Sequence, residues 1–223
     1  MDSRKGSRVS AVPPVSYPVS DSSLKRLFDI LGASVLLLVS SPLVVGIAVL
    51  IGVSTGLPIF FRHERVGRQG TVFHCLKFRT MVVDAEEWLS RDDGLNARHR
   101  EAGYKLPLSE DPRVTSIGRL LRRSQLDELP QLWNVIVGDM SLVGPRPLVD
   151  EELSWYEGEA RGKLLSVRPG IFGPWTALGR SRPGYPERAQ LDLSYVDNTS
   201  VLHDLRLLSA HVPVVLRGQS DDT

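Results

Sequence analysis

The sequence predicts an α+β, mostly helical fold, with an N-terminal re-entrant membrane helix, a small β-hairpin and a compact domain with helices on the membrane surface. An almost entirely apolar run covers residues 27–53. Two short apolar segments flank a glycine-containing turn at 66–70, and apolar residues recur at helical spacing after Leu126. A chain of 223 residues can bury one good core, so we expect one domain with attachments.

The composition excludes several classes of protein and site. The chain has 27 Lys and Arg against 26 Asp and Glu, so it lacks the basic excess of a nucleic-acid-binding protein and we expect no nucleic-acid partner. Its single cysteine, Cys75, excludes an intramolecular disulfide and a Cys-cluster zinc site, and fits a small buried hydrophobe. The histidines show no metal-ligand spacing and receive no role.

The N-terminal segment differs in composition from the rest of the chain. Residues 1–23 are rich in Ser, Pro and Val and show no helical or strand periodicity. We therefore expect a flexible tail that ends where the apolar run begins.

Residues 24–57 are predicted to form a re-entrant membrane helix broken at Ser41-Pro42. The run exceeds the about 20 apolar residues that a crossing needs, so a single-pass helix is the commoner alternative. Pro42 removes one backbone donor, and the serines before it can bond the freed backbone groups, which favours a sharp bend. Each arm would then be only ~16–18 Å long, too short to cross the bilayer alone.

Charge on both flanks separates these two alternatives. Basic residues precede the run at Arg4, Lys5, Arg8, Lys25 and Arg26, and follow it at Arg62, Arg65 and Arg68. The positive-inside rule places both flanks on the cytoplasmic face. A dip into one leaflet satisfies this requirement, and a crossing does not.

Residues 58–218 are predicted to form the compact domain. It begins with the β-hairpin, and the charged stretch 82–103 forms a partly helical surface element. Helices follow at 115–123 and from Leu126 to Ile136. Residues 201–217 alternate apolar and charged positions, which fits a core helix and a membrane-surface helix equally well.

Two adjacent carboxylates, Asp127 and Glu128, are the candidate reactive groups. Four arginines occur within residues 111–123, just before them. Pro130 is tolerated only in the first turn of a helix, so both carboxylates should lie near a helix N-terminus. The helix dipole and the guanidinium groups there favour an ionised carboxylate, which is a usable nucleophile toward phosphorus. Taken alone, the pattern fits a helix cap more often than a nucleophile.

Cationic candidates for phosphate binding surround this pair in the sequence. Pro145 and Pro147 fix the backbone on either side of Arg146, so that side chain loses little entropy when it binds a phosphate. A stiff connector with a surface arginine is the alternative. Strand alternation places Lys77 and Arg79 on one face. The full set of candidate substrate-binding residues is Lys77, Arg79, Arg122, Pro145, Arg146, Pro147 and Arg168.

Five motifs, in order, resemble the bacterial sugar transferase family of small monotopic phosphoglycosyl transferases. They are KFRTM at 77–81, DPRVT at 111–115, LDELPQLWNV at 126–135, GDMSLVGPRP at 138–147 and VRPGI at 167–171. The resemblance covers residues 25–218. It implies that Asp127 is the nucleophile and that Glu128 is a metal ligand or base. It also implies that both carboxylates hold Mg²⁺, that Arg122 and Lys77 bind phosphate, and that residues 145–147 lie on the nucleotide side.

The resemblance implies transfer of a phospho-sugar from a UDP-sugar to polyprenyl (undecaprenyl) phosphate, with release of UMP and a covalent intermediate on Asp127. This is the first membrane step of glycoconjugate or exopolysaccharide synthesis. The enzyme would contact membrane lipids of the bacterial inner membrane, with its N-terminus and catalytic domain on the cytoplasmic face. The sequence leaves open which sugar is used and whether the chain forms a homo-oligomer.

One segment departs from the family pattern. Where members usually read ITGLWQV, this chain has Phe172 and Thr176 in place of Thr and Gln. We expect this change to bear on the choice of sugar. The alternative function is a membrane-anchored binding or scaffold protein on an inactivated domain, and the intact Asp127, Glu128, Arg122 and Arg146 argue against it.

Overall fold

The computed structural model describes residues 22–101, 106–179 and 183–217, so the tail expected at 1–23 lies almost wholly outside the described residues. The helices are α1 (Ser23–Thr55), α2 (Ala85–Arg91), α3 (Asp93–Glu101), α4 (Ser116–Ser124), α5 (Gln131–Val137), α6 (Glu159–Leu164), α7 (Pro174–Ala177), α8 (Glu187–Asp197) and α9 (Val201–Arg217). The strands are β1 (Phe60–Val66), β2 (Val72–Phe78), β3 (Ser141–Val143) and β4 (Gly170–Phe172), and 3₁₀ turns occupy η1 (Arg68–Gly70), η2 (Leu126–Glu128) and η3 (Asp150–Trp155).

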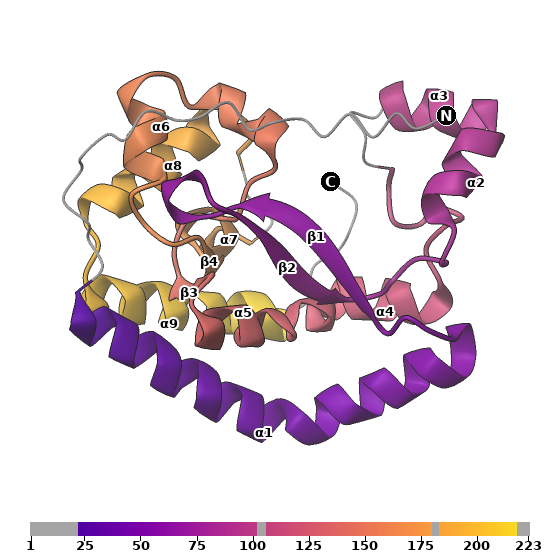
Figure 1. Ribbon diagram of the computed structural model, residues 1–223, viewed down its shortest axis with the longest axis horizontal. Coiled ribbons are helices and arrows are strands. Elements are labelled where there is room, and N and C mark those ends of the chain that lie inside the picture. Colours follow the sequence, from indigo (N-terminus) through magenta and orange to yellow (C-terminus); the bar gives the residue numbers. More distant parts are fainter. Residues whose placement is uncertain (1–21, 102–105, 180–182, 218–223) are drawn as a thin grey trace.

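Helix α1 forms the base of the molecule, with α9, α5 and α4 next to it and the β1–β2 hairpin beyond them (Figure 1). Helices α6 and α8 lie at one side of the hairpin, and α2 and α3 at the other. The prediction of a mostly helical α+β fold is confirmed for the described residues.

Helix α1 bends in its middle without interruption. Pro42 lies inside the 33-residue helix, and Figure 1 shows the bend. Pro42 cannot donate to the carbonyl of Leu38, and the Ser41 hydroxyl donates to that oxygen instead at 2.7 Å. The Ser40 hydroxyl donates to Leu36 at 2.7 Å. The expected break is therefore a bend within one helix.

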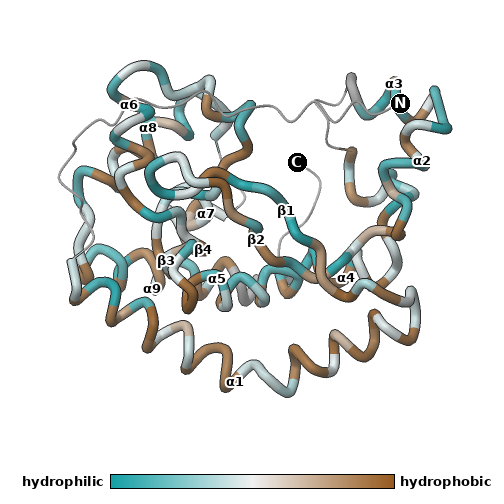
Figure 2. The backbone as a smooth tube through the Cα atoms, in the orientation of Figure 1, coloured by the Kyte–Doolittle hydropathy of each residue, from teal (hydrophilic) through white to brown (hydrophobic). Residues whose placement is uncertain are grey.

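Helix α1 presents apolar side chains on most of its surface. Leu38, Val39 and Val53 are 75%, 74% and 83% exposed, and Figure 2 shows that apolar residues dominate the helix. Among the residues the structure describes, it is the one helix long and apolar enough to cross a membrane. Exposed apolar surface of this extent marks an interaction with lipid or protein.

The N-terminal arm of α1 is fixed to the domain by a buried charge network. Lys25 Nζ lies 2.6 Å from Asp204 Oδ2 of α9, and both side chains are almost fully buried. Asp29 is fully buried and accepts hydrogen bonds from the Ser141 hydroxyl at 2.8 Å and the Leu142 N–H at 3.0 Å. These contacts join α1 to β3 and α9.

The C-terminal arm contacts the same domain. The buried Arg79 lies just beyond β2, and its Nη2 is 2.9 Å from the Thr55 carbonyl and 2.7 Å from that of Gly56, at the end of α1. Ile51 packs with Phe78 in a buried cluster. Both ends of α1 are thus held by one body, with the bend between them.

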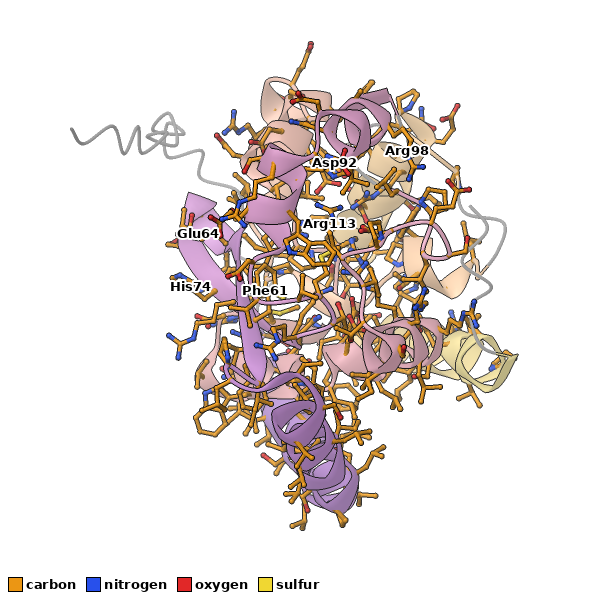
Figure 3. All side chains as sticks on the ribbon, turned by 90° about the vertical axis from the view of Figure 1, so that its right-hand side faces the viewer. Phe61, Glu64, His74, Asp92, Arg98 and Arg113 are labelled. Atoms are coloured by element: carbon orange, nitrogen blue, oxygen red, sulfur yellow. The ribbon has the colours of Figure 1, made fainter. Side chains whose placement is uncertain are left out.

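The hairpin is confirmed with the expected turn. Strands β1 and β2 pair antiparallel, with Phe60 opposite Phe78 and Val66 opposite Val72. Glu64 and His74 lie on the outer side of this hairpin, away from the domain (Figure 3). A second, parallel pair joins β3 to β4.

The predicted helix at 115–123 is confirmed as α4, whose N-cap Thr115 accepts from the Gly118 N–H at 2.9 Å. A Cβ at Gly118 would lie 1.9 Å from the Thr80 carbonyl oxygen, so this close approach requires glycine. The helix expected from Leu126 begins only after Pro130, because residues 126–128 form η2.

Helices were also expected in part of residues 82–103 and along residues 201–217. The first stretch contains the two short helices α2 and α3. The second is α9, which buries Asp204 and His211 and leaves Leu202, Leu205 and Val212 exposed. Helix α9 therefore packs one face on the core and keeps apolar residues on its surface.

We expect Asp204→Ala to destabilise the fold, because it leaves Lys25 buried without its nearest partner. Breaking a buried pair of this kind costs about 3–5 kcal/mol. The matched control is Asp197→Ala, which removes an exposed pair with Lys163 and should cost under ~1 kcal/mol. Thermal unfolding of the full chain in detergent measures both changes, and equal shifts in Tm would contradict the role of the network.

Candidate active site

Asp127 and Glu128 lie in η2, between α4 and α5. Gln125 adopts a left-handed conformation (φ 58°), which turns the chain sharply after α4. Pro130 is at the N-cap of α5, where its missing N–H costs nothing. The prediction that both carboxylates lie near a helix N-terminus is confirmed. Asp127 is only 8% exposed.

Lys77 of β2 binds Glu128 directly. Its Nζ lies 2.6 Å from Glu128 Oε1, and both side chains are partly exposed. Burial alone would raise the pKa of Glu128, but the charges of Lys77, Arg146 and Arg65 outweigh it and lower the pKa to about 2. Glu128 is therefore ionised at all physiological pH values.

Asp127 has the opposite electrostatic environment. Burial and the adjacent negative charge of Glu128 raise its pKa to about 6, while Lys77 and Arg122 act in the other direction. The sequence predicted that the surroundings favour the ionised form of both carboxylates. That prediction holds for Glu128 and is wrong for Asp127, because desolvation exceeds the effect of the cations. Asp127 nevertheless remains mostly ionised at neutral pH.

Next to this pair is a polar pocket. Its lining includes Arg65, Lys77, Glu128, Gln131, Arg146 and Pro147. The pocket is therefore formed by β1, β2, the η2–α5 junction and the loop after β3, and β4 also contributes to it. Such a concentration of guanidinium and ammonium groups suits a diphosphate.

The structure brings together only some of the predicted cationic residues. Lys77 and Arg146 share the pocket, and the charge of Arg122 acts on Asp127 while its Nε donates to the Thr80 hydroxyl at 2.9 Å. Pro147 lines the pocket, and Pro145 contributes a carbonyl that accepts from the Gly170 N–H at 2.8 Å.

Arg79 and Arg168 have contacts elsewhere. Arg79 binds the end of α1, because β2 ends at Phe78 and strand alternation no longer applies beyond it. The Arg168 Nε donates to the Gly138 carbonyl at 2.7 Å, at the end of α5. The geometry therefore gives both arginines structural contacts that position the elements around the pocket.

The sequence did not single out Arg65, Gln131 or His63 for the site. Arg65 was counted only as a basic flank, although Phe61 lies opposite Lys77 in the hairpin register and strand alternation puts His63 and Arg65 on the same face. Burial and the nearby charges of Arg65, Lys77 and Arg146 lower the pKa of His63 to about 4, so it is neutral at pH 7.

The changed positions Phe172 and Thr176 contact α9. The Phe172 ring lies edge-on to His211 at 5.2 Å, and Thr176 Oγ1 is 2.8 Å from His211 Nε2. The same segment reaches the pocket through Gly170 and Ile171.

The donor set suits a hard cation that also binds phosphate. Across residues 22–101, 106–179 and 183–217, no group of three or more His, Cys, Asp or Glu side chains could enclose a metal. Mg²⁺ is often held by one or two carboxylates together with substrate phosphates. Glu128 is bound to Lys77, so Asp127 is the better placed of the two carboxylates to bind Mg²⁺. Substrate phosphates would have to supply further oxygen ligands.

Comparisons with known proteins identify the family of the chain. The chain is 44% identical over 192 residues to the exopolysaccharide production protein ExoY of Rhizobium meliloti, covering 86% of this chain and 84% of that protein. It is 41% identical to the UDP-galactose-lipid carrier transferase of Erwinia amylovora and 40% identical to the undecaprenyl-phosphate galactose phosphotransferase of Salmonella typhimurium. Both alignments cover 89% of this chain but only 41% of the longer relative. The model of the family described as bacterial sugar transferase matches residues 20–218, and the chain belongs to that family.

Proposed function

We propose that this enzyme, a phosphoglycosyl transferase, moves a phospho-sugar from a UDP-sugar to undecaprenyl phosphate and releases UMP, in the first membrane step of exopolysaccharide synthesis. The names of the relatives from Erwinia, Salmonella and Rhizobium support the acceptor, the sugar phosphate and the pathway class. The observation that carries the proposal is the buried Asp127, mostly ionised at neutral pH, beside a pocket lined by Lys77, Arg65 and Arg146.

The proposed reaction has two displacements at one phosphorus atom. A carboxylate oxygen of Asp127 forms a bond to the sugar-bearing phosphorus, the bond from that phosphorus to the bridging oxygen breaks, and UMP leaves with the electron pair. A phosphate oxygen of the polyprenyl phosphate then attacks the same phosphorus and releases the Asp127 carboxylate. Arg122 and Arg146 would stabilise the phosphate charges during both steps.

Desolvation of Asp127 favours the first displacement. A carboxylate with a raised pKa is more basic than one in water, and it is still ionised at neutral pH. The resemblance implied a metal ligand or a base at Glu128. A carboxylate with a pKa of about 2 that already binds Lys77 is a poor base, so we assign Glu128 to holding Lys77 and to supporting Mg²⁺. Mg²⁺ held by Asp127 and Glu128 would offset the charge of the diphosphate.

We further propose that α1 enters and leaves the cytoplasmic face of the inner membrane, as a re-entrant helix of a monotopic protein. Three features support this arrangement. Both ends of α1 contact one domain, the helix bends at Pro42, and its apolar side chains are exposed. Basic residues on both flanks favour the cytoplasmic side for each end.

Asp127→Asn is expected to abolish turnover and to leave membrane association intact, because an amide cannot attack phosphorus but has nearly the same size. UMP release by the purified full chain measures the effect. Asp93→Asn on the surface of α3 is the matched control and should keep normal activity. Near-normal UMP release by Asp127→Asn would contradict the assigned role.

The kcat/KM for the UDP-sugar should rise with pH through about 6. Asp127 loses its proton in that range and becomes nucleophilic, so one pH unit below 6 should reduce kcat/KM roughly tenfold. Burial also raises the pKa of Asp192 to about 6, so this carboxyl must be separated from Asp127. The rise of kcat/KM with pH through about 6 should persist in Asp192→Asn. A kcat/KM that does not change from pH 4.5 to 8, or loss of its rise near pH 6 in Asp192→Asn, would contradict the assignment to Asp127.

A further inference from the structure

Arg65 faces the pocket from β1, and its side chain is 11% exposed. Arg146 lines the same pocket, and burial together with the charge of Arg146 lowers the pKa of Arg65. Two arginines that line one pocket repel each other. A fold that keeps both in place needs compensating contacts, and those contacts indicate what Arg65 does.

The loop that carries Arg146 is held by a hydrogen bond on each side of that residue. The Pro145 carbonyl accepts from the Gly170 N–H at 2.8 Å, and the Pro147 carbonyl accepts from Arg65 Nη1 at 3.1 Å. Proline has no N–H, so neither residue next to Arg146 can donate a backbone hydrogen bond to fix the loop. The loop is therefore held through its carbonyl groups. One of the two donors is a backbone N–H, and the other is the Arg65 side chain.

Further contacts around Arg65 support its hydrogen bond to the Pro147 carbonyl. The Val66 N–H donates to the Leu148 carbonyl at 2.9 Å, so residues 65–66 bind residues 147–148 side by side. Arg65 Nη2 lies 3.1 Å from His63 Nδ1, and neutral His63 can accept that hydrogen bond. These contacts fix the plane of the Arg65 guanidinium.

Glu152 of η3 provides the compensating negative charge. Its Oε2 lies 3.5 Å from Arg65 Nη1, and its Oε1 lies 3.2 Å from Arg188 Nη1. The Val149 N–H donates to Glu152 Oε2 at 3.2 Å and orients the carboxylate. Arg65 Nη1 is therefore shared between the Glu152 carboxylate and the Pro147 carbonyl, while Nη2 faces His63.

We propose that Arg65 is a positioning residue for the donor, which acts by holding the 145–147 loop so that Arg146 faces the nucleotide diphosphate. This inference rests on the proposed function and adds a residue to it. Because Arg65 acts through Arg146, its removal should matter only while Arg146 is present.

The test is a double-mutant cycle with UMP as the probe. Binding of UMP to the full chain in detergent is measured by calorimetry for the unaltered protein, Arg65→Gln, Arg146→Ala and the double variant. We expect Arg65→Gln to weaken UMP binding by roughly tenfold, as for loss of a hydrogen bond from a charged group. The double variant should bind UMP no more weakly than Arg146→Ala alone.

The control is Arg62→Gln, an exposed arginine on the same strand, which should bind UMP normally. Arg65→Lys keeps the positive charge but loses the planar guanidinium group, so it should weaken UMP binding less than Arg65→Gln does. If Arg65→Gln does not fold, Arg65→Lys replaces it in the double-mutant cycle. Normal binding by the Arg65 variants, or additive losses in the double variant, would overturn the inference. Absence of UMP binding by the unaltered chain would instead contradict the proposed function.

Discussion

The attachment of both ends of α1 to one domain is the constraint on which the rest of the structure depends. At one end, Lys25 and Asp29 are buried against β3 and α9, and at the other Arg79 binds the last carbonyls of the helix. A long apolar helix held in this way brings the domain close to any membrane it enters. The contacts at this second end also hold the end of β2, the strand that carries Lys77 toward Glu128, against α1.

The site combines two carboxylates with different environments. Glu128 is paired with Lys77 and keeps its charge, whereas Asp127 is desolvated and has a raised pKa. Adjacent residues reach these different states because the short η2 turn directs one side chain toward the cationic pocket and buries the other. A basic but ionised carboxylate beside fixed cations would suit the proposed attack on a diphosphate.

The sequence predicted those features that depend on local rules. The hairpin, the helix at 115–123 and the position of Pro130 next to α5 follow from strand patterning, helical periodicity and proline geometry. The role of Ser41 beside Pro42 followed from the same reasoning. Features that depend on tertiary packing could not be predicted in this way. They include the use of Arg79 at the end of α1, the desolvation of Asp127 and the contact between Arg65 and Pro147.

The proposed re-entrant arrangement of α1 is tested most directly by labelling both of its flanks. Cysteines introduced at Leu24 and Leu57, which are 65% and 74% exposed, can be labelled with a membrane-impermeant maleimide, while burial raises the pKa of the native Cys75 thiol and keeps it unreactive. Both introduced cysteines should be protected in intact spheroplasts and labelled in inverted membrane vesicles. Labelling of one cysteine from each side would show that α1 crosses the membrane and would contradict the account.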